Sequence, residues 1–120
     1  MIAAGQMSIF GLHLTQIGSG DFLLDPSRSL NVRDMDRLIE EVTAHLMQVR
    51  AVRLYYDLSD LGLIDPLYYS WLDALARAAH IVNVEMICIR MQPTAAFALA
   101  RFIEGPPAFK TALEIQDWQN

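Results

Sequence analysis

The pattern of apolar and polar residues predicts an α/β domain with a mixed, mostly parallel sheet and helices packed against it. Three observations indicate this class. Short apolar runs alternate with helical segments, the later runs are apolar on both faces as in buried parallel strands, and a paired hairpin opens the chain. The expected order is β-β-α-β-α-β-α-β, and right-handed crossovers limit how these elements can be arranged.

The hairpin is expected at the start of the chain. Residues 7–17 alternate roughly between apolar and other side chains, which is typical of a strand. Gly18-Ser19-Gly20 then supplies a turn, and residues 21–24 form a short second strand that pairs with the first. Asp25-Pro26-Ser27 ends that strand. Because the glycines lie between two strands and not before a helix, they do not form a phosphate-binding loop.

The first helix is expected after Asn31, which is a plausible N-cap. Apolar residues follow with helical spacing, and charged residues form the solvated face. The apolar set is Met35, Leu38, Ile39, Val42, Leu46 and Val49, and the charged set is Arg33, Asp36, Arg37, Glu40 and Glu41.

The centre of the chain, residues 53–80, reads as a strand, an acidic loop and a second helix. Residues 52–58 are the strand, and Asp57, Asp60 and Asp65 lie in or beside the loop. Asp65-Pro66 is a strong helix start, because the Asp side chain accepts orphan N–H groups and Pro is tolerated at the first helical position. The spacing of the helix turns Trp71 inward and leaves a polar stripe of Ser70, Asp73, Arg77 and His80.

Three further elements are expected after the second helix. Asn83 stops that helix, and residues 84–89 form another buried strand. Residues 94–104 form a third helix with Phe97, Arg101 and Glu104 on its outer side, ended by Gly105-Pro106-Pro107. Residues 110–115 form a last edge strand, and residues 116–120 leave little room for a further helix.

Composition excludes several classes of protein. The chain has 120 residues, which fits one domain with a core spanning about residues 8–115. Charges interrupt its apolar stretches before they reach membrane-spanning length, and its N-terminus lacks the features of a signal peptide. The net charge of −5 without a basic cluster argues against nucleic acid as a partner. We therefore expect a cytoplasmic protein without direct membrane insertion.

Two segments carry a resemblance to a known family. Residues 54–66 (LYYDLSDLGLIDP), followed by a helix and a strand and then Met91-Gln92-Pro93-Thr94-Ala95-Ala96, resemble the STAS domain of anti-sigma factor antagonists. The tail FKTALEI is similar to the close of that domain. Among its branches, the chain most resembles the small single-domain scaffold proteins of the bacterial stressosome. The resemblance implies a regulatory domain that binds proteins and has no catalytic activity and no cofactor.

The chain departs from that family at three positions. The family carries a phosphorylated Ser or Thr at the position of Pro66, and some relatives carry a second phosphoacceptor near Ala98; neither residue has a hydroxyl. Arg90 also stands where the family usually has Gly. The resemblance therefore implies a domain that stays in one state, as a scaffold or constitutive binder.

Family members dock their partners between the start of the second helix and the third helix. The resemblance carries this role to seven residues: Asp65, Tyr68, Tyr69, Asp73, Thr94, Phe97 and Arg101. The expected partners are other STAS-domain proteins, an anti-sigma factor or a serine/threonine switch kinase, and self-association is expected. Aromatic residues at this place also favour an interaction surface, although such residues can equally belong to the core or scatter over a surface.

Alternative functions remain open from the sequence. The chain could be a STAS subunit of a membrane transporter complex, or a small phosphoacceptor or enzyme that uses Asp57, Asp60 and Asp65 to hold Mg²⁺. Asp65 is also explained by helix capping alone. The three histidines lie on different elements, and Cys88 lies in an apolar strand, so we expect no metal site and an inert thiol.

Overall fold

A computed structural model describes residues 6–115 of the chain, apart from the side chain of Met7. The expectations for residues 116–120 and for the N-terminal residues 1–5 lie outside the described residues. The strands are β1 (Gln6–Ile9), β2 (Leu12–Gly18), β3 (Asp21–Pro26), β4 (Arg53–Asp57), β5 (Glu85–Ile89) and β6 (Lys110–Ala112). The helices are η1 (Val32–Asp34, a 3-10 turn), α1 (Met35–Gln48), α2 (Pro66–Ile81) and α3 (Pro93–Ala100).

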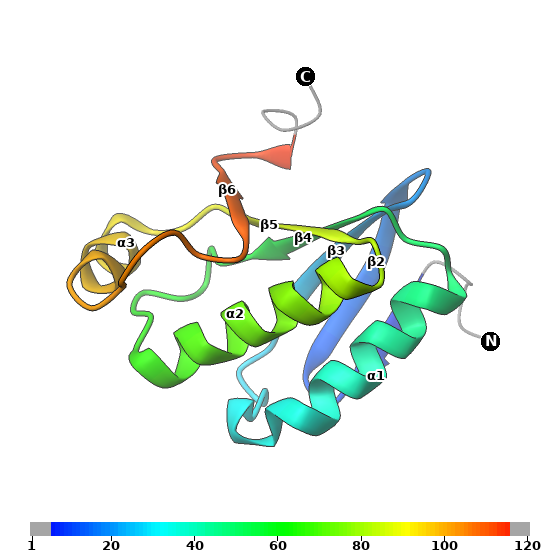
Figure 1. The fold of residues 1–120 in the computed structure, drawn as a ribbon, viewed down its shortest axis with the longest axis horizontal. Helices are drawn as coiled ribbons and strands as arrows, with labels where there is room; N and C mark the ends of the chain where they lie inside the picture. The colour runs from blue at the N-terminus through cyan, green and yellow to red at the C-terminus, as the bar shows by residue number, and fades with distance from the viewer. Residues whose placement is uncertain (1–5, 116–120) are drawn as a thin grey trace.

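The described strands form one mixed sheet in the order β1-β2-β3-β4-β5-β6. The first three strands are antiparallel, and β3, β4, β5 and β6 run parallel to one another. Helices α1 and α2 cover one face of the sheet, and α3 lies at one end of the molecule (Figure 1). The predicted fold class is therefore confirmed.

The main core lies between the sheet and the two long helices. Trp71 and Leu72 of α2 and Leu38 of α1 are buried there, together with Tyr56 and Phe22 from the central strands. A smaller cluster of Tyr55, Ile87 and Ile89 lies apart from this core and packs against Leu23, Ala112 and Ile115. Both faces of β4 and β5 are therefore buried, as their continuous apolar runs predict.

One expected strand is in fact two. Residues 7–17 do not form a single strand, because the chain turns at Phe10 and Gly11, whose φ angles are +43° and +91°. Positive φ at both residues is typical of the two-residue turn that matches the twist of a hairpin. A Cβ on Gly11 would lie 2.8 Å from the backbone nitrogen of Leu30, so glycine is required there. Phe at the first turn position hid the turn, since Asn or Asp usually stands there.

Other boundaries also differ from those expected. Helix α3 ends at Ala100 and not at residue 104, because the chain tightens into three-residue turns in which Arg101 N–H donates to the Ala98 carbonyl and Phe102 N–H to the Leu99 carbonyl. Strand β6 ends at Ala112 and not at residue 115. Asn31 does act as a cap, but for the 3-10 turn that precedes α1. No helix in residues 6–115 is long and apolar enough to cross a membrane.

Candidate interaction site at the start of helix α2

The start of α2 is built as its sequence predicts. The Asp65 carboxylate accepts the backbone N–H of Tyr68 at 2.8 Å, and Pro66 occupies the first helical position. Both residues are exposed. Asp65 also places a negative charge at the positive end of the helix dipole, which stabilises the helix start. The helix therefore begins at a rigid, acidic corner that faces solvent.

The loop before α2 is attached to the start of α3. The Gln92 amide donates to the Ser59 carbonyl at 2.5 Å, and the Thr94 hydroxyl donates to the Gly62 carbonyl at 2.6 Å. Each bond joins segments more than 30 residues apart in the sequence. The loop and the two helix starts consequently form one preorganised surface, with the Thr94 hydroxyl already engaged in holding it together.

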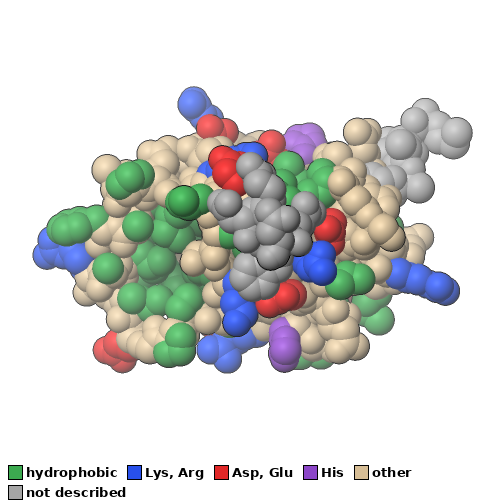
Figure 2. All heavy atoms as spheres, turned by 90° about the horizontal axis from the view of Figure 1, so that it is seen from above, with side chains coloured by type: hydrophobic (Ala, Val, Ile, Leu, Met, Phe, Trp, Pro, Cys, Tyr) green, Lys and Arg blue, Asp and Glu red, His purple; other side chains and the backbone are tan. Residues whose placement is uncertain are grey.

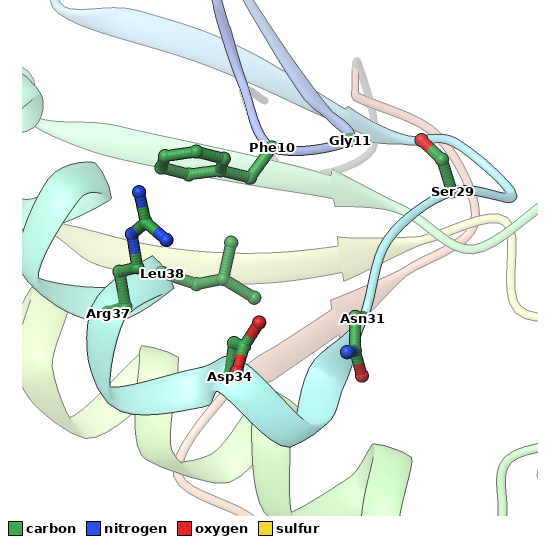
Figure 3. A pocket seen from close by; sticks show the side chains of 7 residues that line it. All are labelled: Phe10, Gly11, Ser29, Asn31, Asp34, Arg37 and Leu38. Carbon is green, nitrogen blue, oxygen red and sulfur yellow. The ribbon is translucent and has the colours of Figure 1, made fainter.

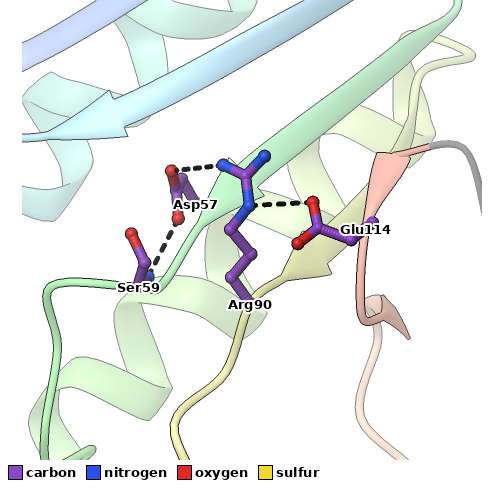
Figure 4. Close-up of polar contacts among 4 residues, drawn as sticks. All are labelled: Asp57, Ser59, Arg90 and Glu114. Atoms are coloured by element: carbon purple, nitrogen blue, oxygen red, sulfur yellow. Dashed lines mark hydrogen bonds and ion pairs between the residues drawn. The ribbon is translucent and has the colours of Figure 1, made fainter.

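A second set of polar contacts lies at the ends of β4 and β5 (Figure 4). The Arg90 guanidinium lies 3.1 Å from Asp57 Oδ2 and 3.0 Å from Glu114 Oε2. The other oxygen of Asp57 accepts the Ser59 N–H at 2.9 Å. Asp57 is largely buried, whereas Arg90 is partly exposed. Through these bonds, Arg90 joins the loop before α2 to the C-terminal part of the described chain. Hydrogen bonding to Glu114 raises the Arg90 pKa, so the guanidinium stays charged.

Tyrosine side chains anchor α2 to the sheet. The Trp71 indole donates to the Tyr56 hydroxyl at 2.9 Å, and the Tyr56 and Tyr68 hydroxyls lie 2.6 Å apart. Burial raises the pKa of Tyr68 to about 12, so its phenol remains neutral and can donate a hydrogen bond. Tyr69 packs edge-on against Phe102 and Phe109. Both helix tyrosines are therefore partly buried and have structural contacts.

Exposed apolar side chains complete this end of the molecule. Leu63 is 62% exposed and Phe97 is 68% exposed. Arg101 lies one turn beyond Phe97, with its guanidinium 5.8 Å from the centre of the Phe97 ring. Hydrophobic side chains gather at the end of the molecule that carries α3 (Figure 2). We call the exposed Asp65, Leu63, Thr94, Phe97 and Arg101 the α2–α3 surface.

The residues expected to bind partners differ in their exposure and in their contacts. Asp65, Thr94, Phe97 and Arg101 are exposed, whereas Tyr68 and Tyr69 are partly buried and contact other aromatic side chains. Asp73 lies further along α2, where it pairs with Arg77 at 2.8 Å and accepts the Ala108 N–H at 3.4 Å. Ala98 is partly buried in α3. The role of all these residues in binding stays a prediction.

Sequence reasoning missed two features of this site. Leu63 and Ile64 are neighbouring apolar residues in the loop, and the sequence does not indicate which of them faces solvent. In the structure Ile64 is buried and Leu63 is exposed. In the sequence, Arg90 stands out only as a departure from the glycine of the family that the chain resembles. Its pairing with Asp57 follows from β4 and β5 being parallel neighbours, which places their carboxyl ends together.

The aspartates of the loop do not converge. Asp57 pairs with Arg90, and Asp65 caps α2. Within residues 6–115, no three His, Cys, Asp or Glu side chains are grouped so that they could hold a metal ion. Cys88 is buried, and burial raises the pKa of its thiol well above the ordinary value, so it is a poor nucleophile.

Comparison of the whole fold with solved structures gives clear matches. A variant of RsbS from Moorella thermoacetica superposes with a TM-score of 0.74 at 18% identity, covering 88% of this chain and 91% of that one. The chain has the STAS fold. A structure of the stressosome, described as a signal integration and transduction hub, matches with a TM-score of 0.70 at 18% identity, covering 86% and 89%.

A third STAS structure extends the comparison. It is the Thermotoga maritima protein TM1081, described as a candidate anti-sigma factor antagonist, with a TM-score of 0.63 at 14% identity and coverage of 87% and 88%. Neither a family model nor a curated protein sequence matches the chain. At these identities the likeness shows the STAS fold, and the function has to be argued from the residues.

Proposed function

We propose that the chain is a non-catalytic regulatory domain that binds other proteins, as a stressosome-type scaffold or in the manner of an anti-sigma factor antagonist. Its partners are then other STAS-domain proteins, an anti-sigma factor or a serine/threonine switch kinase, and it associates with copies of itself. Support comes from the STAS fold and from the names of the proteins that share it.

The α2–α3 surface is the observation that carries this proposal. Its apolar side chains, Leu63 and Phe97, are exposed on a framework that hydrogen bonds hold in place. A preorganised surface loses little conformational entropy when a partner binds. Aromatic and arginine side chains such as Phe97 and Arg101 also contribute strongly to interfaces.

The absence of a hydroxyl at Pro66 and Ala98 supports a constitutive role. A phosphate on the first residue of a helix would sit beside free N–H groups and add charge to the interface. Pro66 is exposed at this place but has no hydroxyl to accept a phosphoryl group. Partner binding is therefore proposed to be independent of phosphorylation.

Affinity capture from the source organism tests the binding role. Tagged protein is exposed to lysate, and the bound proteins are identified by mass spectrometry. STAS-domain proteins, a switch kinase or an anti-sigma factor among them would support the proposal. Subunits of a membrane transporter would instead favour a role in a transport complex, and recovery of no partner from any growth condition would contradict the binding role.

Intact-mass measurement tests the constitutive state. Protein isolated from its native cells is expected to have the mass of the unmodified chain under both resting and stress conditions. The exposed Ser59, and Ser70 and Thr94, whose hydroxyls donate to the Pro66 and Gly62 carbonyls, are the places to inspect by peptide mapping. Stoichiometric phosphate on any of them would refute phosphorylation-independent binding.

A further inference from the structure

We propose that strand β1 is a dimerisation edge, at which the β1 strands of two copies of the chain pair antiparallel across a two-fold axis. This proposal concerns a surface away from α2 and α3, and it rests on one part of the proposed function, the association of the chain with copies of itself, for which it gives the place. It follows from how the two edges of the described sheet differ.

Within the part of the chain that the structure describes, strand β1 is an edge that lacks most of the usual protection. Among the described strands it pairs with β2 alone. Proteins commonly protect exposed edges with charged side chains, proline, bulges or very short strands. The first ten residues of the chain, MIAAGQMSIF, contain no charged residue and no proline. The β1–β2 register is also regular over its four paired residues.

The opposite edge is protected in the expected manner. Strand β6 has only three residues, and its first residue is the exposed Lys110. In a symmetric strand pair centred on Lys110, the two lysines would lie opposite each other, which costs free energy. The same symmetry brings no like charges together at β1, because the residues of this strand are uncharged. The chain as a whole carries a net charge of −5. The β1 edge is therefore suited to a second copy of this chain.

The backbone of β1 is oriented for such pairing. Ile9 and Leu12 flank the two-residue turn and are paired directly. In a hairpin of this kind that pair is hydrogen-bonded, and hydrogen-bonded pairs alternate with pairs whose polar groups point outward. The N–H and C=O of Ser8, the next residue, therefore point away from β2. The Ser8 side chain is exposed.

The end of β1 is held rigidly against the rest of the molecule. The Arg37 guanidinium of α1 lies 4.1 Å from the centre of the Phe10 ring (Figure 3), and the Gly11 carbonyl accepts the Ser27 N–H at 2.8 Å. A cavity of about 320 Å³ beside this turn is lined by Phe10, Arg37, Asn31 and Asp34, among others. Phe10 remains 51% exposed. The edge is consequently preorganised, and an aromatic side chain flanks it.

Sedimentation of the full chain over a wide concentration range tests the proposal. A four-residue edge buries less surface than a standard interface of about 1,600 Å², so the dimer should be reversible. The apparent mass of the wild type is expected to rise with concentration from 13.5 kDa towards twice that value. Ser8→Lys should remain monomeric, because a symmetric pair centred on Ser8, whose polar backbone groups point outward, would bring two cations together. Thr111→Lys, at the other edge, should dimerise like the wild type.

Two further measurements keep the test decisive. Ser8→Pro removes the outward N–H without affecting the bonds to β2, and it should also abolish the dimer; circular dichroism checks that each variant is folded. In the wild type, hydrogen exchange of the Ser8 amide should slow as the concentration rises. A wild type that stays monomeric would overturn the proposal. So would a dimer that survives both Ser8 substitutions or is lost in Thr111→Lys or Phe97→Ala.

Discussion

Arg90 shows how two opposing effects meet at one residue. Its φ angle of +57° lies in the left-handed region, which costs a residue with a Cβ about 1 kcal/mol or more. Its guanidinium pairs with Asp57 and Glu114. Because Asp57 is largely buried, loss of its cation would leave a carboxylate poorly compensated. The ion pairs therefore outweigh the strain, and arginine is tolerated where glycine would be easier to accommodate.

Substitutions at Arg90 separate these two effects. Arg90→Gly loses the ion pairs but relieves the strain, so it should lower the free energy of unfolding by about 1–2 kcal/mol. Arg90→Ala loses the ion pairs and keeps the strain, so it should cost roughly 1 kcal/mol more than glycine. Urea unfolding of both variants measures the order. Equal stabilities of the two variants would contradict a cost from backbone strain at residue 90. An Arg90→Gly variant as stable as the wild type would contradict stabilisation by the ion pairs.

His45 is expected to make stability depend on pH. Its Nε2 atom is enclosed near the end of α1 and has no hydrogen-bond partner among residues 6–115. The end of a helix favours a positive charge, yet burial dominates and lowers the His45 pKa from 6.5. The folded protein therefore holds this proton more weakly than the unfolded chain. Its contribution to stability is present above pH 6.5 and is lost as the pH falls towards the folded pKa.

The substitution His45→Leu should weaken the dependence of stability on pH. Wild type is expected to be less stable at about pH 5.5 than at about pH 7.5, and His45→Leu should reduce the difference because no imidazole remains to take up the proton. His13→Gln, at an exposed position on β2, controls for the loss of a histidine. Thermal unfolding at the two pH values provides the comparison. An unchanged difference in His45→Leu would assign the pH dependence to other groups.

At the scale of elements, α2 is the part of the molecule most directly readable from the sequence. Its start at Asp65-Pro66 and its stop at Asn83, which has a φ of +64°, are both local signals. The hairpin turn and the end of α3 were less predictable. Phe10 and Gly11 form the turn at a place where Gly11 lies close to the Leu30 backbone, and α3 stops before the Gly-Pro-Pro segment. The close approach of Gly11 to Leu30 is a tertiary contact, and the end of α3 is made by three-residue turns that no residue type marks in the sequence.

The cap of α2 gives the prediction at this scale. Asp65→Ala removes the acceptor for the Tyr68 N–H, so the free energy of unfolding should fall by about 1 kcal/mol. Asp65→Asn keeps an acceptor and should recover most of the loss. Asp60→Ala changes the same charge at an exposed position on the same loop and should be close to neutral. Chemical denaturation compares the three, and an equal loss for Asp60→Ala would attribute the effect to charge instead of capping.

For the whole molecule, the fold class followed from the sequence and the interaction surface only in part. Alternating strands and helices predicted the mixed sheet. The α2–α3 surface joins a loop after β4 to a helix after β5, and parallel pairing of these strands brings the two together. The exposure of Leu63 could not be predicted, because the sequence does not indicate which of two neighbouring apolar residues packs into the core. In the structure Ile64 packs into the core.

The most direct test of the central claim compares binding of a captured partner to two matched variants. Phe97→Ala truncates the α2–α3 surface, whereas Met47→Ala truncates a side chain that is similarly exposed, at 62%, near the end of α1. Calorimetric titration should show Phe97→Ala weakening the affinity about tenfold or more. Met47→Ala should bind like the wild type, and both variants should unfold cooperatively. Equal affinities of Phe97→Ala and the wild type would contradict the claim that the domain acts through this surface.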